Sequence, residues 1–246
     1  MSLLGLERAG SGPALVWLHG FTQTKRSSHR FRSILAGSYE VLTIDLPGHG
    51  ENAERSASLE DTADLLAEVL PAEPFILAGY SLGGRVALHF ALRHPQRLNH
   101  LVVLSATPGI ASDEERRARR ERDEKLADRL EAIGIDTFLD EWLAQPMFSS
   151  VPHDAAERAA RSRDAHGLAN SLRQAGTGTQ GDLTEPLRQL STPTSILAGA
   201  KDEKFTYEAM RLSEAIAGST RHLVADAGHA AHLEQPQRVA DLVAMI

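Results

Sequence analysis

Ser81, Asp202 and His229 are the residues of this chain whose types and order could do chemistry together. A serine hydroxyl becomes a base or a nucleophile when an imidazole takes its proton and a carboxylate fixes the tautomer of that imidazole. Each of the three residues comes shortly after an apolar run, and they follow one another in the order serine, acid, histidine. Because this order is one in which such triads occur, the sequence predicts a catalytic triad.

Ser81 lies in the pattern G-x-S-x-G, within the stretch Gly79 to Gly84 (GYSLGG). An apolar run at 75–78 precedes the pattern and a helix-favouring stretch at 85–93 follows it, which is the context of a nucleophile elbow. Glycine at 79 and 83 allows the tight turn that this elbow needs. We therefore expect the Ser81 hydroxyl at the N-terminus of a helix, whose dipole favours developing negative charge.

Other acids and bases lie close to the two partners of Ser81. Glu203 is one residue deeper in its loop and Asp226 is close to His229 in sequence, so Asp202 is preferred as the acid. His232 competes with His229 as the base, and we expect it to cap or pack near the site instead.

Two backbone amides are candidates for an oxyanion hole, which is a pair of N–H groups that stabilises a negatively charged oxygen. One is the amide of Phe21, in the loop after the apolar run at 14–18, and the other is the amide of Leu82. Asp45 begins a further turn, DLPGHG, and is interpreted as a structural residue that binds loop backbone.

The elements that must position these residues are short apolar runs alternating with amphipathic stretches, a pattern typical of βαβ units and a parallel sheet. Each expected strand leads into a polar or glycine-containing loop, at the edge where such sheets bind ligands. Strands are expected at 14–18, 41–44, 75–78, 101–104, 194–198 and 222–225, and helices at 59–70, 85–93, 207–216 and 237–246.

The middle of the chain has a different character. From 113 to 163 charged and helix-favouring residues dominate, without a strand-like run. We expect several helices inserted after the strand at 101–104, lying over the ligand crevice as a lid. The expected organisation is one α/β core formed by 1–109 and 186–246, with the lid at 110–185.

The composition excludes several classes of protein. A length of 246 residues with 42% hydrophobic and 24% charged residues fits one large globular α/β domain. The absence of cysteine excludes disulfides, thiolate zinc sites and cysteine nucleophiles, and the histidines show no metal-ligand spacing. The net charge of −7 disfavours nucleic acid as a partner, and no apolar run approaches the roughly 20 residues of a membrane span. Because the first ten residues lack a signal-peptide pattern, we expect a cytoplasmic protein without membrane insertion.

The chain resembles the α/β-hydrolase superfamily over nearly its whole length. It is also similar to one family within it, the 2-succinyl-6-hydroxy-2,4-cyclohexadiene-1-carboxylate synthases of menaquinone biosynthesis. The stretches that carry this closer resemblance are Trp17 to Phe21, Gly79 to Arg85, Glu114 to Arg116 with Arg119 to Asp123, Phe138 to Trp142 with Gln145 to Phe148, and Gly167 to Arg173 leading into Gly176 to Gln180.

This resemblance implies a carbon–oxygen lyase that eliminates pyruvate from 2-succinyl-5-enolpyruvyl-6-hydroxy-3-cyclohexene-1-carboxylate without metal or organic cofactor. It implies that Ser81 is the base that removes a ring proton, and that the amides of Phe21 and Leu82 stabilise the oxyanion of the intermediate. The substrate-binding residues that it implies are Tyr80, Arg85, Arg119, Trp142 and Arg161, with Arg163 as the alternative to Arg161.

The arginines agree with a small, multiply anionic substrate. Only four of the 26 basic residues are lysine, and planar guanidinium groups bind carboxylates with two parallel hydrogen bonds. Arg85 lies four residues after Ser81, which places both on one face of the expected helix. A charged residue at a crevice rarely supports the core, so we expect Arg85 to matter little for folding. The expected assembly is a monomer or a small homo-oligomer.

Two alternatives remain open. A carboxylester or carbon–carbon bond hydrolase would use the same fold and triad, but a neutral ester gives no reason for Arg85 beside the serine. A non-catalytic ligand receptor on the same scaffold is the other alternative, and the complete triad argues against it.

Overall fold

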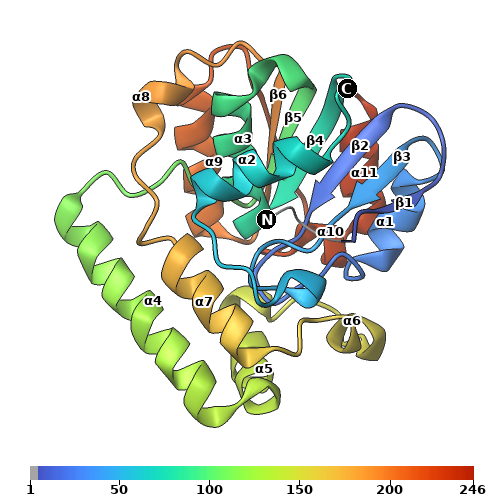
Figure 1. Ribbon diagram of the computed structural model, residues 1–246. Coiled ribbons are helices and arrows are strands. Elements are labelled where there is room, and N and C mark those ends of the chain that lie inside the picture. Colours follow the sequence, from blue (N-terminus) through green and yellow to red (C-terminus); the bar gives the residue numbers. More distant parts are fainter. Residues whose placement is uncertain (1–4) are drawn as a thin grey trace.

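The computed structural model describes residues 5–246, and the first four residues, which belong to the stretch compared with a signal peptide, lie outside the described residues. A seven-stranded sheet with the order β1-β3-β2-β4-β5-β6-β7 forms the centre of the molecule (Figure 1). Its strands are β1 (Glu7–Ala9), β2 (Ala14–Leu18), β3 (Glu40–Thr43), β4 (Phe75–Tyr80), β5 (Leu98–Leu104), β6 (Thr194–Gly199) and β7 (Thr220–Val224).

The sheet confirms the expected α/β-hydrolase architecture. All neighbouring strands are parallel except β1, which pairs with β3 in the antiparallel direction. The six predicted strands are present with bounds shifted by up to three residues. The sequence did not predict β1, because its three residues, Glu-Arg-Ala, contain no apolar run.

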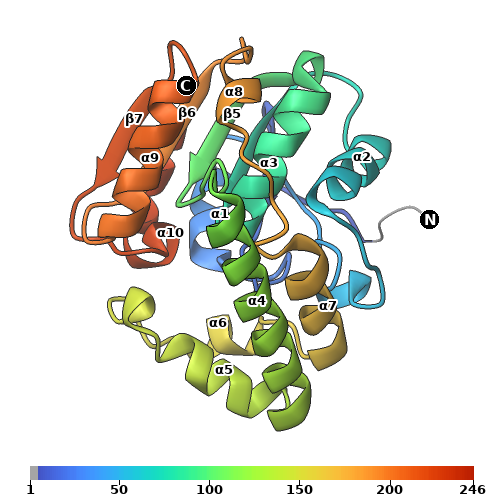
Figure 2. The ribbon, with the colours of Figure 1, turned by 90° about the vertical axis from the view of Figure 1, so that its left-hand side faces the viewer.

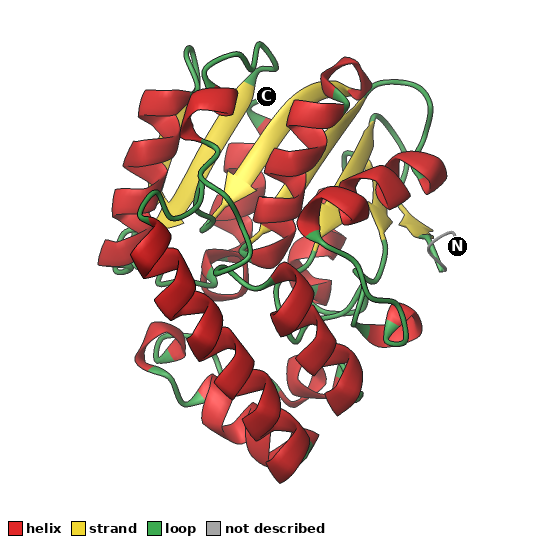
Figure 3. Cartoon of the chain, turned by 60° about the vertical axis from the view of Figure 1, so that its left-hand side comes forward, coloured by secondary structure: helices red, strands yellow, loops and turns green. Residues whose placement is uncertain are grey.

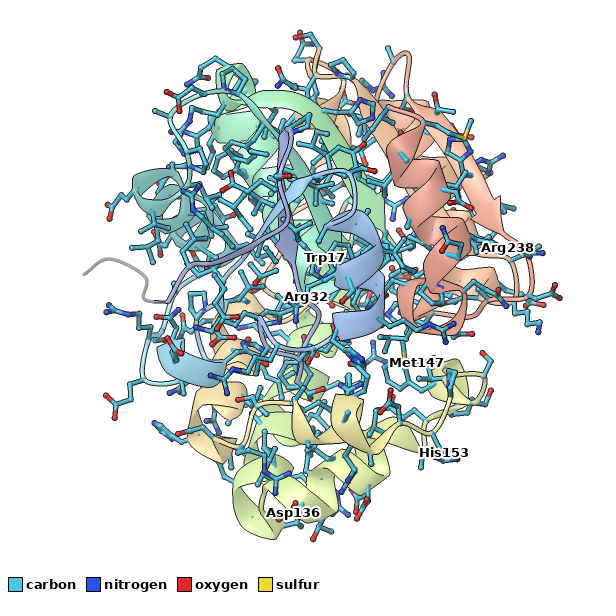
Figure 4. The ribbon with its side chains drawn as sticks, turned by 90° about the vertical axis from the view of Figure 1, so that its right-hand side faces the viewer. Trp17, Arg32, Asp136, Met147, His153 and Arg238 are labelled. Carbon is cyan, nitrogen blue, oxygen red and sulfur yellow. The ribbon has the colours of Figure 1, made fainter. Side chains whose placement is uncertain are left out.

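Alternate residues of the central strands pack against helices on opposite faces of the sheet. On β2, Val16 and Leu18 belong to one hydrophobic cluster, whereas Leu15 and Trp17 belong to the other. Figure 4 shows Trp17 beside α1, where its ring contacts that of Phe31 at 4.8 Å between centroids. The first cluster includes α2 (Leu59–Val69), α3 (Leu82–Arg93) and α9 (Glu203–Ala215), and the second includes α1 (His29–Leu35), α10 (Ala231–Glu234) and α11 (Pro236–Ala244).

Two helices begin earlier than the apolar periodicity predicts. α3 begins at Leu82 and not at 85, and α9 begins at Glu203 and not at 207. The residue before each helix is a proposed triad member, because Ser81 and Asp202 occupy the N-cap positions. The Asp202 side chain accepts a hydrogen bond from the Phe205 amide, which starts the helix before its first apolar residue. The short helix α1 was not predicted.

Between β5 and β6 the chain forms a group of helices. They lie beyond the edge of the sheet at which the parallel strands have their carboxyl ends (Figures 1 and 3). Figure 2 shows α4 and α7 side by side, and residues of these two helices and α5 share a small hydrophobic cluster that includes Leu130 and Phe138. The helical content expected at 113–163 is thus confirmed, whereas the bounds of a lid at 110 and 185 stay a prediction. The helices of this group are α4 (Asp113–Ile133), α5 (Ile135–Leu143), α6 (Ala155–Ala159) and α7 (Ala165–Ala175). The short helix α8 (Thr184–Leu187) lies apart from them, beside α9 (Figure 1).

Throughout residues 5–246, every helix is too short or too polar to traverse a lipid bilayer.

Candidate active site

Ser81 lies on the turn between β4 and α3 with φ 51° and ψ −105°, a conformation that is strained for a residue with a side chain. The turn is tight, because a Cβ at Gly79 would lie 2.3 Å from the carbonyl oxygen of Gly83. The Ser81 amide donates a hydrogen bond to the carbonyl of Leu104 on the neighbouring strand, at 2.9 Å. These contacts fix the elbow that the sequence predicts.

The structure brings the three predicted triad side chains together from three separate strand ends. The Nε2 atom of His229 lies 3.3 Å from the Ser81 hydroxyl, and its Nδ1 atom lies 2.9 Å from a carboxylate oxygen of Asp202. Because an ionised carboxylate can only accept, Nδ1 carries the proton and Nε2 presents its lone pair to Ser81. The arrangement can therefore take a proton from the serine hydroxyl.

The charge states of His229 and Asp202 suit this transfer. Burial lowers the pKa of His229 more than the hydrogen bond and the negative charge of Asp202 raise it. Burial of Asp202 opposes its ionisation, but the hydrogen bond from His229 and the charge of that ring lower the carboxyl pKa overall. At neutral pH the pair is a neutral imidazole beside a carboxylate, which is the form a general base needs.

A pH profile tests this electrostatic state. His229 must be neutral to accept the serine proton, so activity is lost as pH falls through the imidazole pKa, which lies below 6.5. We expect kcat/KM, measured from about pH 5 to about pH 9, to stay flat through neutrality and to fall only below about 6.5. An acid limb with its midpoint at pH 7 or above would contradict the environment described for His229.

Glu234 holds the loop that carries His229 and was missed by sequence reasoning. One of its carboxylate oxygens accepts from the Gly228 amide at 2.7 Å and the other from the Ala230 amide at 3.1 Å. The carboxylate thus fixes the backbone on both sides of His229. The sequence signal is an acidic residue, Glu234, five positions after His229. Only the turn before α10 brings this side chain back onto the loop that carries His229.

The loop that carries Phe21 is fixed to the elbow. The carbonyl of His19 accepts from the Gly83 amide at 3.1 Å, and the His19 ring accepts from the Leu46 amide at 3.0 Å. Burial lowers the pKa of His19 to about 4, so this ring is neutral. Within residues 5–246, neither the Phe21 amide nor the Leu82 amide donates a hydrogen bond to a protein group, which leaves both free for a ligand oxygen.

A cavity of about 910 Å³ opens above Ser81, between the strand ends and helices α4, α5 and α7. Its volume is within the range typical of small-molecule sites. Ser81, His229, Phe21 and Leu82 line it, whereas Asp202 does not. Four of the predicted substrate-binding residues also line it: Tyr80, Arg85, Arg119 and Trp142. Polar residues that were not predicted also line it, among them Ser105, Arg122 and Lys204.

Arg85, which the sequence places at the crevice beside Ser81, is buried in the structure. Its side chain belongs to a residue with only 8% exposure, and its Nη1 atom has no hydrogen-bond partner in the described chain. Burial, assisted by the positive charge of Arg119, lowers the pKa of Arg85 to about 10, so the group remains charged at neutral pH. A buried guanidinium without a carboxylate partner is unusual and marks a place for an anion.

Arg119 is oriented by a neighbour on α4. Its Nε atom donates to Asp123 at 2.8 Å, and the other oxygen of this buried carboxylate accepts from the Gly178 amide at 2.9 Å. Asp123 therefore fixes Arg119 and also ties α4 to the loop after α7.

The structure separates the two alternatives for the third basic residue. Arg161 is buried but does not line the main cavity, because its guanidinium donates to the Thr22 hydroxyl and borders a second cavity of about 490 Å³. Arg163 borders the same second cavity, is half exposed and pairs with Asp136 on α5. Figure 4 shows Asp136 at the outer end of the inserted helices, far from the sheet.

Trp142 connects the inserted helices to the Phe21 loop. Its ring stacks on that of Phe138 at 6.0 Å and meets the ring of Phe21 edge-on at 5.1 Å. The predicted wall residue therefore packs against the residue that supplies one candidate oxyanion amide.

Three other residues considered from the sequence lie outside the triad. His232 is buried, with its ring 4.3 Å from that of Tyr80 and 5.2 Å from that of Trp17, which confirms the expected packing. Asp226 lies at the surface near Arg238. The interpretation of Asp45 is confirmed, because its carboxylate accepts from two loop amides, those of Lys25 and Glu51. Among residues 5–246, no three His, Asp or Glu side chains cluster closely enough to hold a metal ion.

Comparison with known proteins agrees with this geometry. Residues 15–242 match the model of the alpha/beta hydrolase family. A 2-succinyl-6-hydroxy-2,4-cyclohexadiene-1-carboxylate synthase from Enterobacter sp. (strain 638) is 34% identical, with 100% of this chain and 96% of that protein covered. The structure of MenH from S. aureus has a TM-score of 0.90 and 31% identity, covering 100% of this chain and 97% of that one. A thermophilic esterase from Thermogutta terrifontis, solved with malate bound, has a TM-score of 0.81 and 25% identity, covering 98% and 91%.

Proposed function

This chain belongs to the alpha/beta hydrolase family and, within it, to the 2-succinyl-6-hydroxy-2,4-cyclohexadiene-1-carboxylate synthases, and from that premise we propose how its cavity works. The protein is a lyase of menaquinone biosynthesis. We propose that it eliminates pyruvate from 2-succinyl-5-enolpyruvyl-6-hydroxy-3-cyclohexene-1-carboxylate. The observation that supports this proposal most directly is the buried, unpartnered guanidinium of Arg85 in the cavity that contains Ser81.

Comparison of the substrate and product names defines the bonds that change. The substrate has one ring double bond, at carbon 3, and the product has two, at carbons 2 and 4. A proton must therefore leave carbon 2, and the carbon–oxygen bond to the enolpyruvyl group at carbon 5 must break. The carbonyl of the succinyl group, attached to carbon 2, takes up the electron pair as an enolate oxygen, which then returns it to expel enolpyruvate.

Residues of the chain are assigned to these steps as follows. Ser81 takes the proton from carbon 2 while its own hydroxyl proton passes to Nε2 of His229, 3.3 Å away. Asp202 holds the imidazole and stabilises its charged form through Nδ1. The Phe21 and Leu82 amides donate to the enolate oxygen. The proton held by His229 returns to the departing enolpyruvate, which becomes pyruvate, and the site is restored.

The cations of the cavity are assigned to the substrate's three carboxylates. Arg85 and Arg119 line the cavity and can bind carboxylates with two parallel hydrogen bonds, and Tyr80 and Trp142 form its walls. Arg161 lies outside the cavity lining, so we assign it a long-range electrostatic role and no direct contact with a carboxylate.

The proposal also includes a lid formed by 110–185, which excludes water from the reacting atoms. Contacts of α4, α5 and α7 with the cavity support it. A cytoplasmic location remains part of the proposal, since the curated relative is a bacterial synthase.

The release of pyruvate tests this function. The purified protein is mixed with the enolpyruvyl substrate, and lactate dehydrogenase converts the released pyruvate while NADH absorbance falls. We expect release that depends on the protein and equals the product formed in amount. No pyruvate, together with rapid cleavage of p-nitrophenyl esters, would overturn the proposal in favour of a hydrolase.

A further inference from the structure

Ser105 combines three unusual features. It follows β5 with φ 50°, a left-handed conformation that favours glycine, although it carries a side chain. The residue is 1% exposed, and its hydroxyl has no hydrogen-bond partner within residues 5–246. It also lines the cavity above Ser81. Backbone strain and an unpaired buried hydroxyl both cost folding free energy, and residues that carry such costs cluster at functional sites.

The sheet places Ser105 directly beside Ser81. Tyr80 and Leu104 are register partners on the parallel strands β4 and β5, so the two serines are the next positions on adjacent strands. Their backbones are fixed in the same way, because the Ser81 amide donates to Leu104 and the Ser105 amide donates to Leu197, both at 2.9 Å. Ser105 is therefore held rigidly one strand spacing from the proposed base.

A second unpaired donor lines the same cavity. The Nη1 atom of Arg85 is buried and has no partner in the described chain. The first turn of α3, which precedes Arg85, lies against the residue after Ser105, since a Cβ at Gly84 would be 2.7 Å from that of Ala106. A hydroxyl and a guanidinium that both lack acceptors match the oxygens of a carboxylate, which accepts from several donors and donates to none.

We propose that Ser105 is a substrate-binding residue whose hydroxyl donates a hydrogen bond to a carboxylate oxygen of the bound substrate, beside Ser81. The identity of that substrate rests on the proposed function, whereas the carboxylate subsite itself does not. The hydroxyl is held without an internal partner, so it pays no cost of breaking a protein hydrogen bond when the carboxylate arrives.

The test uses two variants that remove the hydroxyl but differ in their effect on the backbone. Ser105→Ala keeps the strained φ, whereas Ser105→Gly relieves it. Ser28→Ala is the matched control, because Ser28 has φ 60°, 1% exposure and an unpaired hydroxyl but does not line the cavity. The probe is 2-succinylbenzoate, a stable aromatic dicarboxylate that carries the ring carboxylate and the succinyl group of the product on adjacent carbons but lacks its hydroxyl. Its Kd is measured by isothermal titration calorimetry.

We expect both Ser105 variants to bind the probe about tenfold more weakly than the wild type, the loss typical of one hydrogen bond to a charged group, and Ser28→Ala to bind it normally. An equal loss of affinity in the alanine variant, which keeps the strained backbone, and in the glycine variant, which relieves it, identifies the missing hydroxyl as the cause of the loss. Normal affinity in both Ser105 variants, or no binding by the wild type, would overturn the proposal. Pyruvate release by the wild type is measured separately. Absence of pyruvate would contradict the proposed function, whereas unchanged affinity of the Ser105 variants for the probe would contradict the carboxylate subsite.

Discussion

Ser81→Ala is expected to lower kcat for pyruvate release by about 10³-fold or more, with little change in KM. The hydroxyl is the group next to the lone pair of His229 Nε2, at 3.3 Å, and no other hydroxyl of the described chain makes a hydrogen bond to this imidazole. On the proposed mechanism its removal leaves Arg85, Arg119 and the amides of Phe21 and Leu82 in place but interrupts the transfer of the ring proton. The coupled lactate dehydrogenase assay measures the loss.

The control for this variant is binding. Alanine preserves the turn, so the affinity for 2-succinylbenzoate and the melting temperature are expected to match those of the wild type. Ser28→Ala removes a more deeply buried hydroxyl outside the cavity and is expected to retain full activity. If Ser81→Ala keeps more than about a tenth of the wild-type rate, the His229 imidazole removes the ring proton directly and Ser81 is not the base.

Arg85→Met is expected to lower kcat/KM by about 100-fold while raising the free energy of unfolding by about 1 kcal/mol or more. The two effects have one cause, which is a guanidinium that is buried without a carboxylate partner. The empty site bears the cost of desolvating this charge, and a bound carboxylate offsets that cost. Methionine fills similar volume without a charge, whereas alanine would leave a cavity and confuse the stability measurement.

Steady-state kinetics and chemical denaturation of the same preparation check both effects. Arg117→Met is the matched control, since it removes an equal charge from an exposed position on α4 outside the cavity, and we expect it to change neither quantity appreciably. A lower stability of Arg85→Met, together with unchanged kinetics, would show that Arg85 supports the core and does not bind substrate.

The grouping of Ser81, Asp202 and His229 was predictable because each residue follows a signal that can be recognised in a short stretch of sequence. Glycine at 79 and 83 can be read in the sequence, and the structure shows the close backbone contacts that demand it. Asp202 and His229 follow apolar runs that become parallel strands, and the carboxyl ends of parallel strands meet at one edge of the sheet. The elbow motif and the strand periodicity were therefore sufficient to predict that the three residues lie close together.

The binding residues could not be ranked in the same way. Arg85, Arg161 and Arg163 are chemically identical in the sequence, but the fold buries Arg85 in the cavity, turns Arg161 to Thr22 and leaves Arg163 at the surface with Asp136. Which of them meets a ligand depends on how α4 to α7 pack over the sheet, through contacts between residues far apart in the chain.

The sequence by itself determined the fold class, the elbow and the grouping of Ser81, Asp202 and His229, because these follow from strand periodicity and from a turn that only small residues allow. The tertiary structure alone decided that Arg85 is buried without a partner, that Glu234 holds the loop of His229, and that Ser105 stands beside Ser81. Burial and the lack of a hydrogen-bond partner are properties of a side chain's whole surroundings, and those surroundings are assembled from elements that lie up to 200 residues apart.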